Sequence, residues 1–488
     1  MTTDPPAPPA GGDDGTEPAP TPSRDPVRAT GRLARSAASA RIAGRIGAGR
    51  LSGRVRTRLA PAERRQEVAA AAELRTAEQV AASLGEMKGA LMKVGQLASF
   101  LDDGLPEPWR QALASLQSDA APMSPELAAG VVEAELGAPP HRVFRTWEPT
   151  PLAAASIGQV HRAVTAEGRE VAVKVQYPGV AEAIGADLAN TGMLARVLPL
   201  LFPALDPGAL AGELRDRLGE ELDYRHEAAN QRRFGAVYRG HPFIHVPAVV
   251  DELSTGLVLT TELASGSRFA EVERWPAAER DLAGETLFRF VFRGINRLGM
   301  FNGDPHPGNY LFEPGGQVTF LDFGLVKSFT PGETAVFHEM IETLVLRGDG
   351  EGYRRALESV GLLRADPSLP TAAVVEYFGH FYDLVMEPGR RTVEHEYASE
   401  TVRRVFDTGS PVAKAVSLPA MFVIVQRINL GLYALLARLG ATADWRAIAE
   451  ELWPMVDGPP STELGRDEAR WLERRRREGD PVVRPDVP

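Results

Sequence analysis

Three oxygen-bearing side chains at fixed intervals constrain this chain more than any other feature. Asp304 is followed by Asn309, and an Asp-Phe-Gly triplet begins at Asp322. Between Asn309 and Asp322, residues 310–312 and 318–321 have the pattern of two short strands joined by a Glu-Pro-Gly-Gly turn. A hairpin brings its outer ends together, so the pattern predicts that Asn309 and Asp322 lie close, with Asp304 one loop away.

This set of side chains suits phosphoryl transfer. Mg²⁺ prefers carboxylate and carbonyl oxygens and keeps substrate phosphates and water as further ligands. The reaction also needs a group that orients the acceptor hydroxyl. We therefore interpret Asn309 and Asp322 as Mg²⁺ ligands and Asp304 as catalytic. The spacing matches a kinase catalytic loop followed by Asp-Phe-Gly, although Asn302-Gly303 replaces the usual His-Arg. The alternative is a surface loop rich in Asp and Asn.

An upstream strand supplies a candidate phosphate-binding lysine. The run EVAVKVQYPG alternates as a strand does and contains Lys174, one of five lysines among 54 basic residues. In kinases a lysine on such a strand contacts the α and β phosphates and pairs with a helical glutamate. Glu227 is the predicted partner, because Asp223, Glu227, Asn230 and Phe234 fall on one helix face. The alternative is a lysine that faces solvent.

The loop before that strand occupies the place of a phosphate-covering loop. It carries Ala153, Ala154 and Ala155 where kinases have glycines, and these three residues with Ser156 are candidates for nucleotide binding. Alanine restricts φ and adds a methyl group where amides approach phosphate, so slower or altered phosphoryl transfer is the hypothesis. Further along, the linker strand ending at Glu262 and Leu263 is expected to offer backbone hydrogen bonds to adenine.

Composition limits the partners and the compartment. The net charge of −11 makes nucleic acid an improbable main partner, and the absence of cysteine excludes disulfides and thiolate sites. The acidic, Pro-rich start has no signal-peptide pattern, and no apolar run is long enough to span a membrane. We expect a cytoplasmic protein, with peripheral contact to the inner membrane face as a further expectation.

Patterning divides the chain into six segments. We expect a disordered acidic tail (1–27), an Arg-rich arm (28–65), a helical extension (66–140), a strand-rich N-lobe (141–263), a helical C-lobe (264–440) and a helical, Pro-rich tail (441–488). The Arg-rich arm has two interpretations: an amphipathic segment on anionic lipid, or a solvated, partly helical extension. Strands are expected at 157–164, 169–176, 248–253 and 257–263, and helices at 124–136, 208–238, 418–440 and 463–478.

Together these motifs resemble those of the UbiB/AarF-type atypical kinases, the group that includes the ADCK proteins. MKVGQLAS resembles their Lys-x-Gly-Gln motif, with Lys93 and Gln96, and Glu221-Leu222-Asp223 resembles their Glu-x-Asp motif. The resemblance implies an α+β, bilobal protein-kinase-like fold that binds ATP and Mg²⁺. It also implies a helical extension that folds over the site and occludes it through Lys93, Gln96, Glu221 and Asp223. Glu221 and Asp223 point apart on a regular helix, so we expect the helix to start or break near Leu222.

The resemblance implies an atypical kinase or ATPase linked to isoprenoid lipids, notably quinone biosynthesis. A nucleotide-dependent scaffold that transfers no phosphate is the second hypothesis, favoured by the alanine loop and the occluding helix. An aminoglycoside-type small-molecule kinase is third, because it leaves the Lys-x-Gly-Gln and alanine motifs unexplained. The phosphoryl acceptor, the lipid and the oligomeric state stay open.

Overall fold

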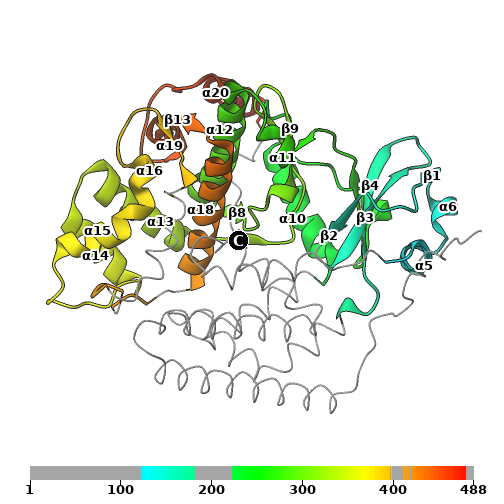
Figure 1. The fold of residues 1–488 in the computed structure, drawn as a ribbon, viewed down its shortest axis with the longest axis horizontal. Helices are drawn as coiled ribbons and strands as arrows, with labels where there is room; N and C mark the ends of the chain where they lie inside the picture. The colour runs from blue at the N-terminus through cyan, green and yellow to red at the C-terminus, as the bar shows by residue number, and fades with distance from the viewer. Residues whose placement is uncertain are drawn as a thin grey trace, which may run out of the picture.

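The computed structural model describes residues 123–155, 157–181, 222–395, 397, 410–413, 415–417 and 420–479. The expected segments 1–27 and 28–65 lie outside these residues, as do Lys93, Gln96, Ser156 and Glu221. The described residues form two lobes, one rich in strands and the other in helices, with α10 beside the sheet (Figure 1).

The N-terminal lobe is built on a five-stranded sheet in the order β1-β3-β4-β6, with β2 paired to β3. Its strands are β1 (Thr146–Trp147), β2 (Ala153–Ala155), β3 (Gly158–Val164), β4 (Glu170–Gln176) and β6 (Val258–Glu262). Three helices accompany it: α5 (Pro125–Leu136), α6 (Pro140–Val143) and α10 (Tyr224–Val237). The strands expected at 157–164, 169–176 and 257–263 are confirmed.

Alternation along β4 sets the two faces of this sheet. Val171, Val173 and Val175 are buried and share a core with Ala128 of α5. Successive side chains of a strand point to opposite faces, so Lys174 projects from the other side. The helix expected at 124–136 is confirmed, because Ser124 caps α5 by accepting a hydrogen bond from the Leu127 amide.

The strand expected at 248–253 is wrong. Val249 makes only an isolated bridge with Thr261, and Asp251–Leu253 forms the 3₁₀ helix η2. The Ser254 hydroxyl donates to the carbonyl of Val250 at 2.8 Å. Such local side-chain bonds compete with strand pairing, and in this segment the 3₁₀ helix forms instead of a strand.

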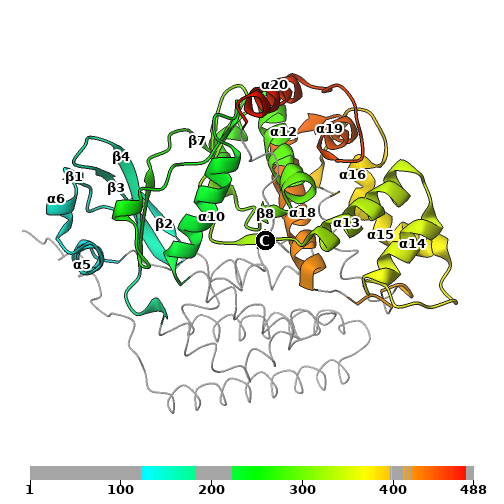
Figure 2. The ribbon, with the colours of Figure 1, turned by 180° about the vertical axis from the view of Figure 1, so that it is seen from behind.

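The C-terminal lobe is mostly helical, with short strands near the interlobe side (Figures 1 and 2). Its helices are α11 (Phe269–Val272), α12 (Ala277–Arg293), α13 (Pro331–Met340), α14 (Gly350–Ser359), α15 (Thr371–Gly379), α16 (Asp383–Met386), α18 (Ala420–Leu439), α19 (Trp445–Leu452) and α20 (Glu463–Arg477). Segments η4 (Pro307–Asn309) and η6 (His380–Tyr382) are 3₁₀ helices, whereas η3 (Gly294–Leu298) and η5 (Ile341–Leu346) are π-helical.

Three small sheets complete this lobe. One has the order β5-β10-β9-β7, and the pairs β8 with β11 and β12 with β13 form the others. Their strands are β5 (Ile244–His245), β7 (Ser267–Arg268), β8 (Met300–Asn302), β9 (Tyr310–Glu313), β10 (Gln317–Phe320), β11 (Val326–Ser328), β12 (Arg391–Thr392) and β13 (Thr442–Ala443). Phe290 of α12 stacks on Phe320 of β10 with ring centroids 3.7 Å apart. Aromatic packing therefore fixes the β9–β10 hairpin on the helical core.

The apolar segment expected at 418–440 is the helix α18. Its residues Ile428, Leu432, Leu436 and Leu439 are buried in the C-lobe core. Among the residues that the structure describes, no helix combines the length and the apolar character needed to cross a membrane.

Candidate functional site

A buried ion pair joins strand β4 to helix α10. The Lys174 ammonium on β4 donates to both carboxylate oxygens of Glu227 on α10, at 2.8 Å each. Their side chains are 15% and 7% exposed, respectively. The predicted Lys174–Glu227 pairing is thus present in the structure, and the elements predicted to carry the two residues do so.

The environment of Lys174 keeps it charged. Its ammonium lies 3.6 Å from the Asp322 carboxylate and 5.1 Å from the ring centroid of Tyr224. Burial alone lowers the pKa of Lys174, but the carboxylates of Asp322 and Glu227 outweigh burial and raise that pKa well above its ordinary value of 10.5. Lys174 is therefore a fixed positive charge at neutral pH, able to face a polyanion.

The β9–β10 hairpin brings Asn309 and Asp322 to the same end, as the spacing of the two residues predicts. Phe320 pairs with Tyr310, and the Leu321 amide donates to the Asn309 carbonyl at 2.9 Å. Asp322 follows directly, and its Oδ1 accepts the Gly324 amide at 2.9 Å. Asn309 and Asp322 therefore leave the same end of the hairpin.

Asn309 is oriented by the loop that carries Asp304. Its Nδ2 donates to the Asp304 carbonyl at 3.0 Å and to the Asp304 carboxylate at 3.2 Å. Because the amide nitrogen faces these two acceptors, Asn309 Oδ1 is left as an acceptor for a cation. Asn309 and Asp322 thus offer an amide oxygen and a carboxylate, which fits Mg²⁺ that takes its other ligands from phosphate and water.

Asn302 is a site residue whose role the sequence analysis missed. Its Oδ1 accepts the Asp304 amide at 3.2 Å, while its Nδ2 donates to the Asp322 carbonyl. Asn302 therefore ties the loop that carries Asp304 to the Asp-Phe-Gly segment from a buried position. The departure from His-Arg at this point was visible in the sequence, but the two bonds that it makes were not.

A second missed residue is Gly431 of α18. A Cβ added there would lie 2.2 Å from Pro305 Cγ, next to Asp304. Because Gly431 has no side chain, the proline ring and the loop that carries Asp304 can pack against the helix. A glycine inside an apolar helix costs about 1 kcal/mol relative to alanine and usually has a packing reason, which was the available signal.

The alanine-rich stretch forms a regular strand. Ala153, Ala154 and Ala155 pair with Val160, Gln159 and Gly158, in that order. Ala153 and Ala154 are exposed, and Ser156 lies outside the described residues. Gly158 fits because a Cβ there would come within 2.3 Å of the Val175 carbonyl oxygen. Contact of this hairpin with phosphate stays a prediction.

Two main-chain amides at the end of the linker strand already have partners within the protein. The Glu262 amide donates to the Ala248 carbonyl at 2.8 Å, and the Leu263 amide donates to the Glu170 carbonyl at 3.1 Å. Both amides are engaged because neighbouring chain segments flank the strand on both sides. Neither of these two donors is open to a base in this structure, and contact through other main-chain groups of the linker stays a prediction.

Asp223 acts as a helix cap. Its Oδ1 accepts the Arg225 amide at 3.0 Å, and α10 begins at Tyr224. The expected helix start near Leu222 is confirmed. The predicted contacts of Asp223 with Lys93 and Gln96 stay a prediction, because those two residues and Glu221 lie outside the described part.

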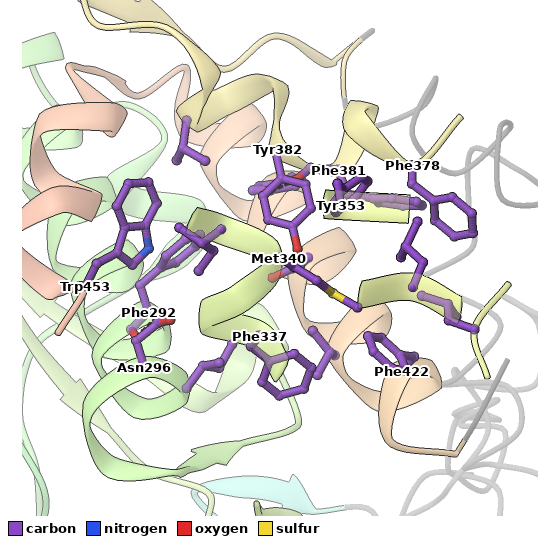
Figure 3. A pocket seen from close by; sticks show the side chains of 18 residues that line it. Phe292, Asn296, Phe337, Met340, Tyr353, Phe378, Phe381, Tyr382, Phe422 and Trp453 are labelled. Carbon is purple, nitrogen blue, oxygen red and sulfur yellow. Dashed lines mark hydrogen bonds between the residues drawn. The ribbon is translucent and has the colours of Figure 1, made fainter. Parts of the chain in front are cut away.

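A separate cavity lies among the helices of the C-lobe (Figure 3). It has a volume of about 80 Å³ and is lined mainly by aromatic and aliphatic side chains. Among the described residues, Asn296 Oδ1 and Trp453 Nε1, which belong to lining residues, have no hydrogen-bond partner.

Comparisons with known proteins agree with this geometry. Residues 115–355 match the family described as ABC1 atypical kinase-like domain. The chain is 33% identical over 332 residues to rat "Atypical kinase COQ8B, mitochondrial". This match covers 67% of this chain and 62% of the rat protein. It is 29% identical to yeast "Atypical kinase COQ8, mitochondrial" over 58% of this chain and 56% of that protein. The chain therefore spans less than two thirds of either relative.

A solved structure extends the likeness. The complex of Rv3197 with erythromycin, from Mycobacterium tuberculosis, has a TM-score of 0.60 and 33% sequence identity, and the match covers 81% of this chain and all of that one. The fold is thus α+β, bilobal and protein-kinase-like. The chain belongs to the ABC1 family of atypical kinase-like proteins, the UbiB/AarF/ADCK group that its motifs resemble.

Proposed function

We propose that this chain binds Mg²⁺-ATP between its lobes and works as an atypical kinase or ATPase in isoprenoid-lipid or quinone metabolism. The observation that carries the proposal is the convergence of Lys174, Glu227 and Asp322. The ammonium lies 2.8 Å from the Glu227 carboxylate and 3.6 Å from that of Asp322. A cation and a metal-binding carboxylate side by side suit the two sides of a phosphate tail.

Each residue has a distinct task in this proposal. Lys174, held by Glu227, contacts the α and β phosphates, and Asn309 with Asp322 holds Mg²⁺. The bound ion would neutralise charge on the phosphate oxygens. Asp304 orients the acceptor hydroxyl or water, and Asn302 keeps Asp304 in register with Asp322 through its bonds to both.

The test is calorimetry and turnover on the full chain. Wild type should bind Mg²⁺-ATP and release phosphate. Asp322→Asn should lose turnover and weaken nucleotide binding in the presence of Mg²⁺, and Lys174→Met should weaken binding with or without the metal. No heat on titrating wild type with adenine nucleotide would end the proposal.

The second candidate is a nucleotide-dependent scaffold without phosphoryl transfer. The observation in its favour is strand β2. Its exposed alanines stand where a phosphate-binding loop has glycines, and their methyl groups hinder the approach of phosphate to the backbone amides. Nucleotide binding with no turnover, with and without added membrane lipid, would favour the scaffold.

Hydroxylated small molecules are a further class to test. Rv3197, which shares 33% identity with this chain, was solved with erythromycin. Erythromycin and aminoglycosides should therefore be offered as acceptors. Transfer of phosphate from ATP to either would revive the small-molecule kinase hypothesis.

A further inference from the structure

The C-terminal helix α20 caps the helix that carries Glu227. The last carbonyls of any helix lack partners within it. In α10 the donor to these carbonyls is Arg475 of α20. Its guanidinium donates to the Ala236 carbonyl at 2.9 Å and to the carbonyl of Val237. Arg475 is only 4% exposed. A cation at this end also matches the helix dipole of α10.

A second contact joins α20 to the segment that leads into β5. His241 Nδ1 accepts the Ile244 amide at 3.1 Å, so the proton of the neutral ring is on Nε2. Nε2 then donates to Glu468 of α20 at 3.3 Å. Ile244 pairs with Val318 of β10, the strand that ends beside Asp322. One face of α20 thus reaches both α10 and the metal-binding hairpin.

The same helix is anchored to α12 by a buried charge network. Arg289 lies 3.1 Å from Glu468, 2.7 Å from Glu285 and 2.9 Å from Glu451. Arg293 adds a contact to Glu468 at 2.9 Å. Burial lowers the pKa of Arg289, but these carboxylates outweigh it and raise that pKa above its ordinary value. The network holds α20 to α12, and Figure 2 shows α20 lying across the top of α12.

Helix α20 packs closely against the residues of this charge network. A Cβ added at Gly465 would lie 2.3 Å from Glu451 Oε2 and 2.7 Å from an Arg289 nitrogen. Trp471 donates from its indole to the Arg239 carbonyl at 3.1 Å. These contacts join α12, α20 and the end of α10 into one body.

We propose that α20 is a strap that positions the nucleotide site, with Arg475 and Glu468 as its positioning residues. Arg475 holds α10, and with it Glu227, while Glu468 holds the β5–β10 pair that leads to Asp322. The inference rests on the proposed function for its effect on nucleotide, but the positioning of α10 does not depend on any ligand. The strap lies outside residues 115–355, which match the family.

Hydrogen–deuterium exchange on the full-length protein tests the positioning directly. Arg475→Met should speed exchange of the α10 amides by about tenfold, because two charge-assisted bonds to its last turn are lost. The matched control is Arg474→Met, which removes an exposed charge from the same helix. Arg475→Lys keeps the charge and should recover part of the protection. If Arg475→Met cannot be purified, Trp471→Phe removes the indole bond to Arg239 and reduces the ring area against which Arg475 packs, so it should give a smaller change of the same kind.

Nucleotide binding supplies the second readout. Arg475→Met should weaken Mg²⁺-ADP binding by about tenfold, whereas Arg474→Met should not change it. Equal exchange of α10 in the two variants would overturn the strap, as would equal acceleration in α10 and in the remote α14. If wild type binds no nucleotide, the proposed function fails, while the exchange comparison still decides whether α20 positions α10.

Discussion

Pro305, in the loop that carries Asp304, lies directly against the α-carbon of Gly431 on α18. A methyl group at Gly431 would come within 2.2 Å of Pro305 Cγ. Helix α18 therefore limits how closely the Asp304 loop can approach it, although α18 is far along the chain from the motifs predicted to be catalytic.

Gly431→Ala should push this loop away from α18 and displace Asp304. We expect the turnover number for ATP to fall between about tenfold and a hundredfold, since small misplacements of reacting groups have such effects. Nucleotide affinity should change little, because Lys174 and Glu227 lie on other elements. The control is Gly130→Ala on α5, where an added Cβ meets nothing within 4 Å. Equal turnover in both variants would contradict the prediction.

The Lys174–Glu227 pair should show strong coupling in stability. Lys174→Met leaves the Glu227 carboxylate buried without its partner, which costs on the order of 3–5 kcal/mol of the free energy of unfolding. Adding Glu227→Gln removes that charge and should restore most of the loss. Urea unfolding of the two single variants and the double variant measures the coupling. Additive losses would show that the pair is not coupled.

Asn302→Asp should separate the catalytic loop from the Asp-Phe-Gly segment. The substitution keeps an acceptor for the Asp304 amide but removes the donor to the Asp322 carbonyl. We expect a higher Mg²⁺ requirement and at least about a tenfold loss of turnover, because the Asp322 carbonyl loses its buried Asn302 donor. Turnover measured against Mg²⁺ concentration at saturating ATP checks this. An unchanged Mg²⁺ curve would count against the bridging role.

The strap should loosen as the pH falls. Burial lowers the pKa of His241 below its ordinary value of 6.5, although Glu468 opposes that effect. Below 6.5 the unfolded chain binds a proton that folded His241 does not, so the free energy of unfolding decreases with falling pH. Arg293 and Arg289 also face this pair and disfavour protonation of the ring.

Urea unfolding at pH 7.5 and 5.5 measures this linkage. His241→Gln should lose less stability than wild type over that interval, by at most about 1.4 kcal/mol per pH unit for one group. His161 and His338 also have pKa values lowered by burial, but they contribute to both proteins. Parallel losses in the two proteins would remove His241 as the cause.

The sequence predicted the residues whose spacing is local. The hairpin between Asn309 and Asp322, the strand of Lys174 and the helix face of Glu227 all follow from short-range periodicity. The sequence did not reveal that the Glu262 and Leu263 amides are already engaged, because their partners, Ala248 and Glu170, come from segments that periodicity cannot place beside the strand.

Long-range contacts account for what the sequence did not reveal. Pro305 meets Gly431, and Arg475 meets Val237, a residue 238 positions away along the chain. Neither contact can be predicted from residue spacing or composition, because each depends on how whole helices pack against one another. The strand expected at 248–253 failed for the opposite reason, since a local hydroxyl bond outweighed its apolar pattern.

The position of α18 and α20 has a practical consequence for recombinant work. A fragment trimmed to residues 115–355 would retain every motif that resembles a kinase, yet it would bare the side of α12 that α18 covers and the carbonyls that Arg475 satisfies. Such a truncation should be insoluble or only partly folded. We therefore expect the smallest fragment that folds on its own to extend beyond residues 115–355, the region that matches the family.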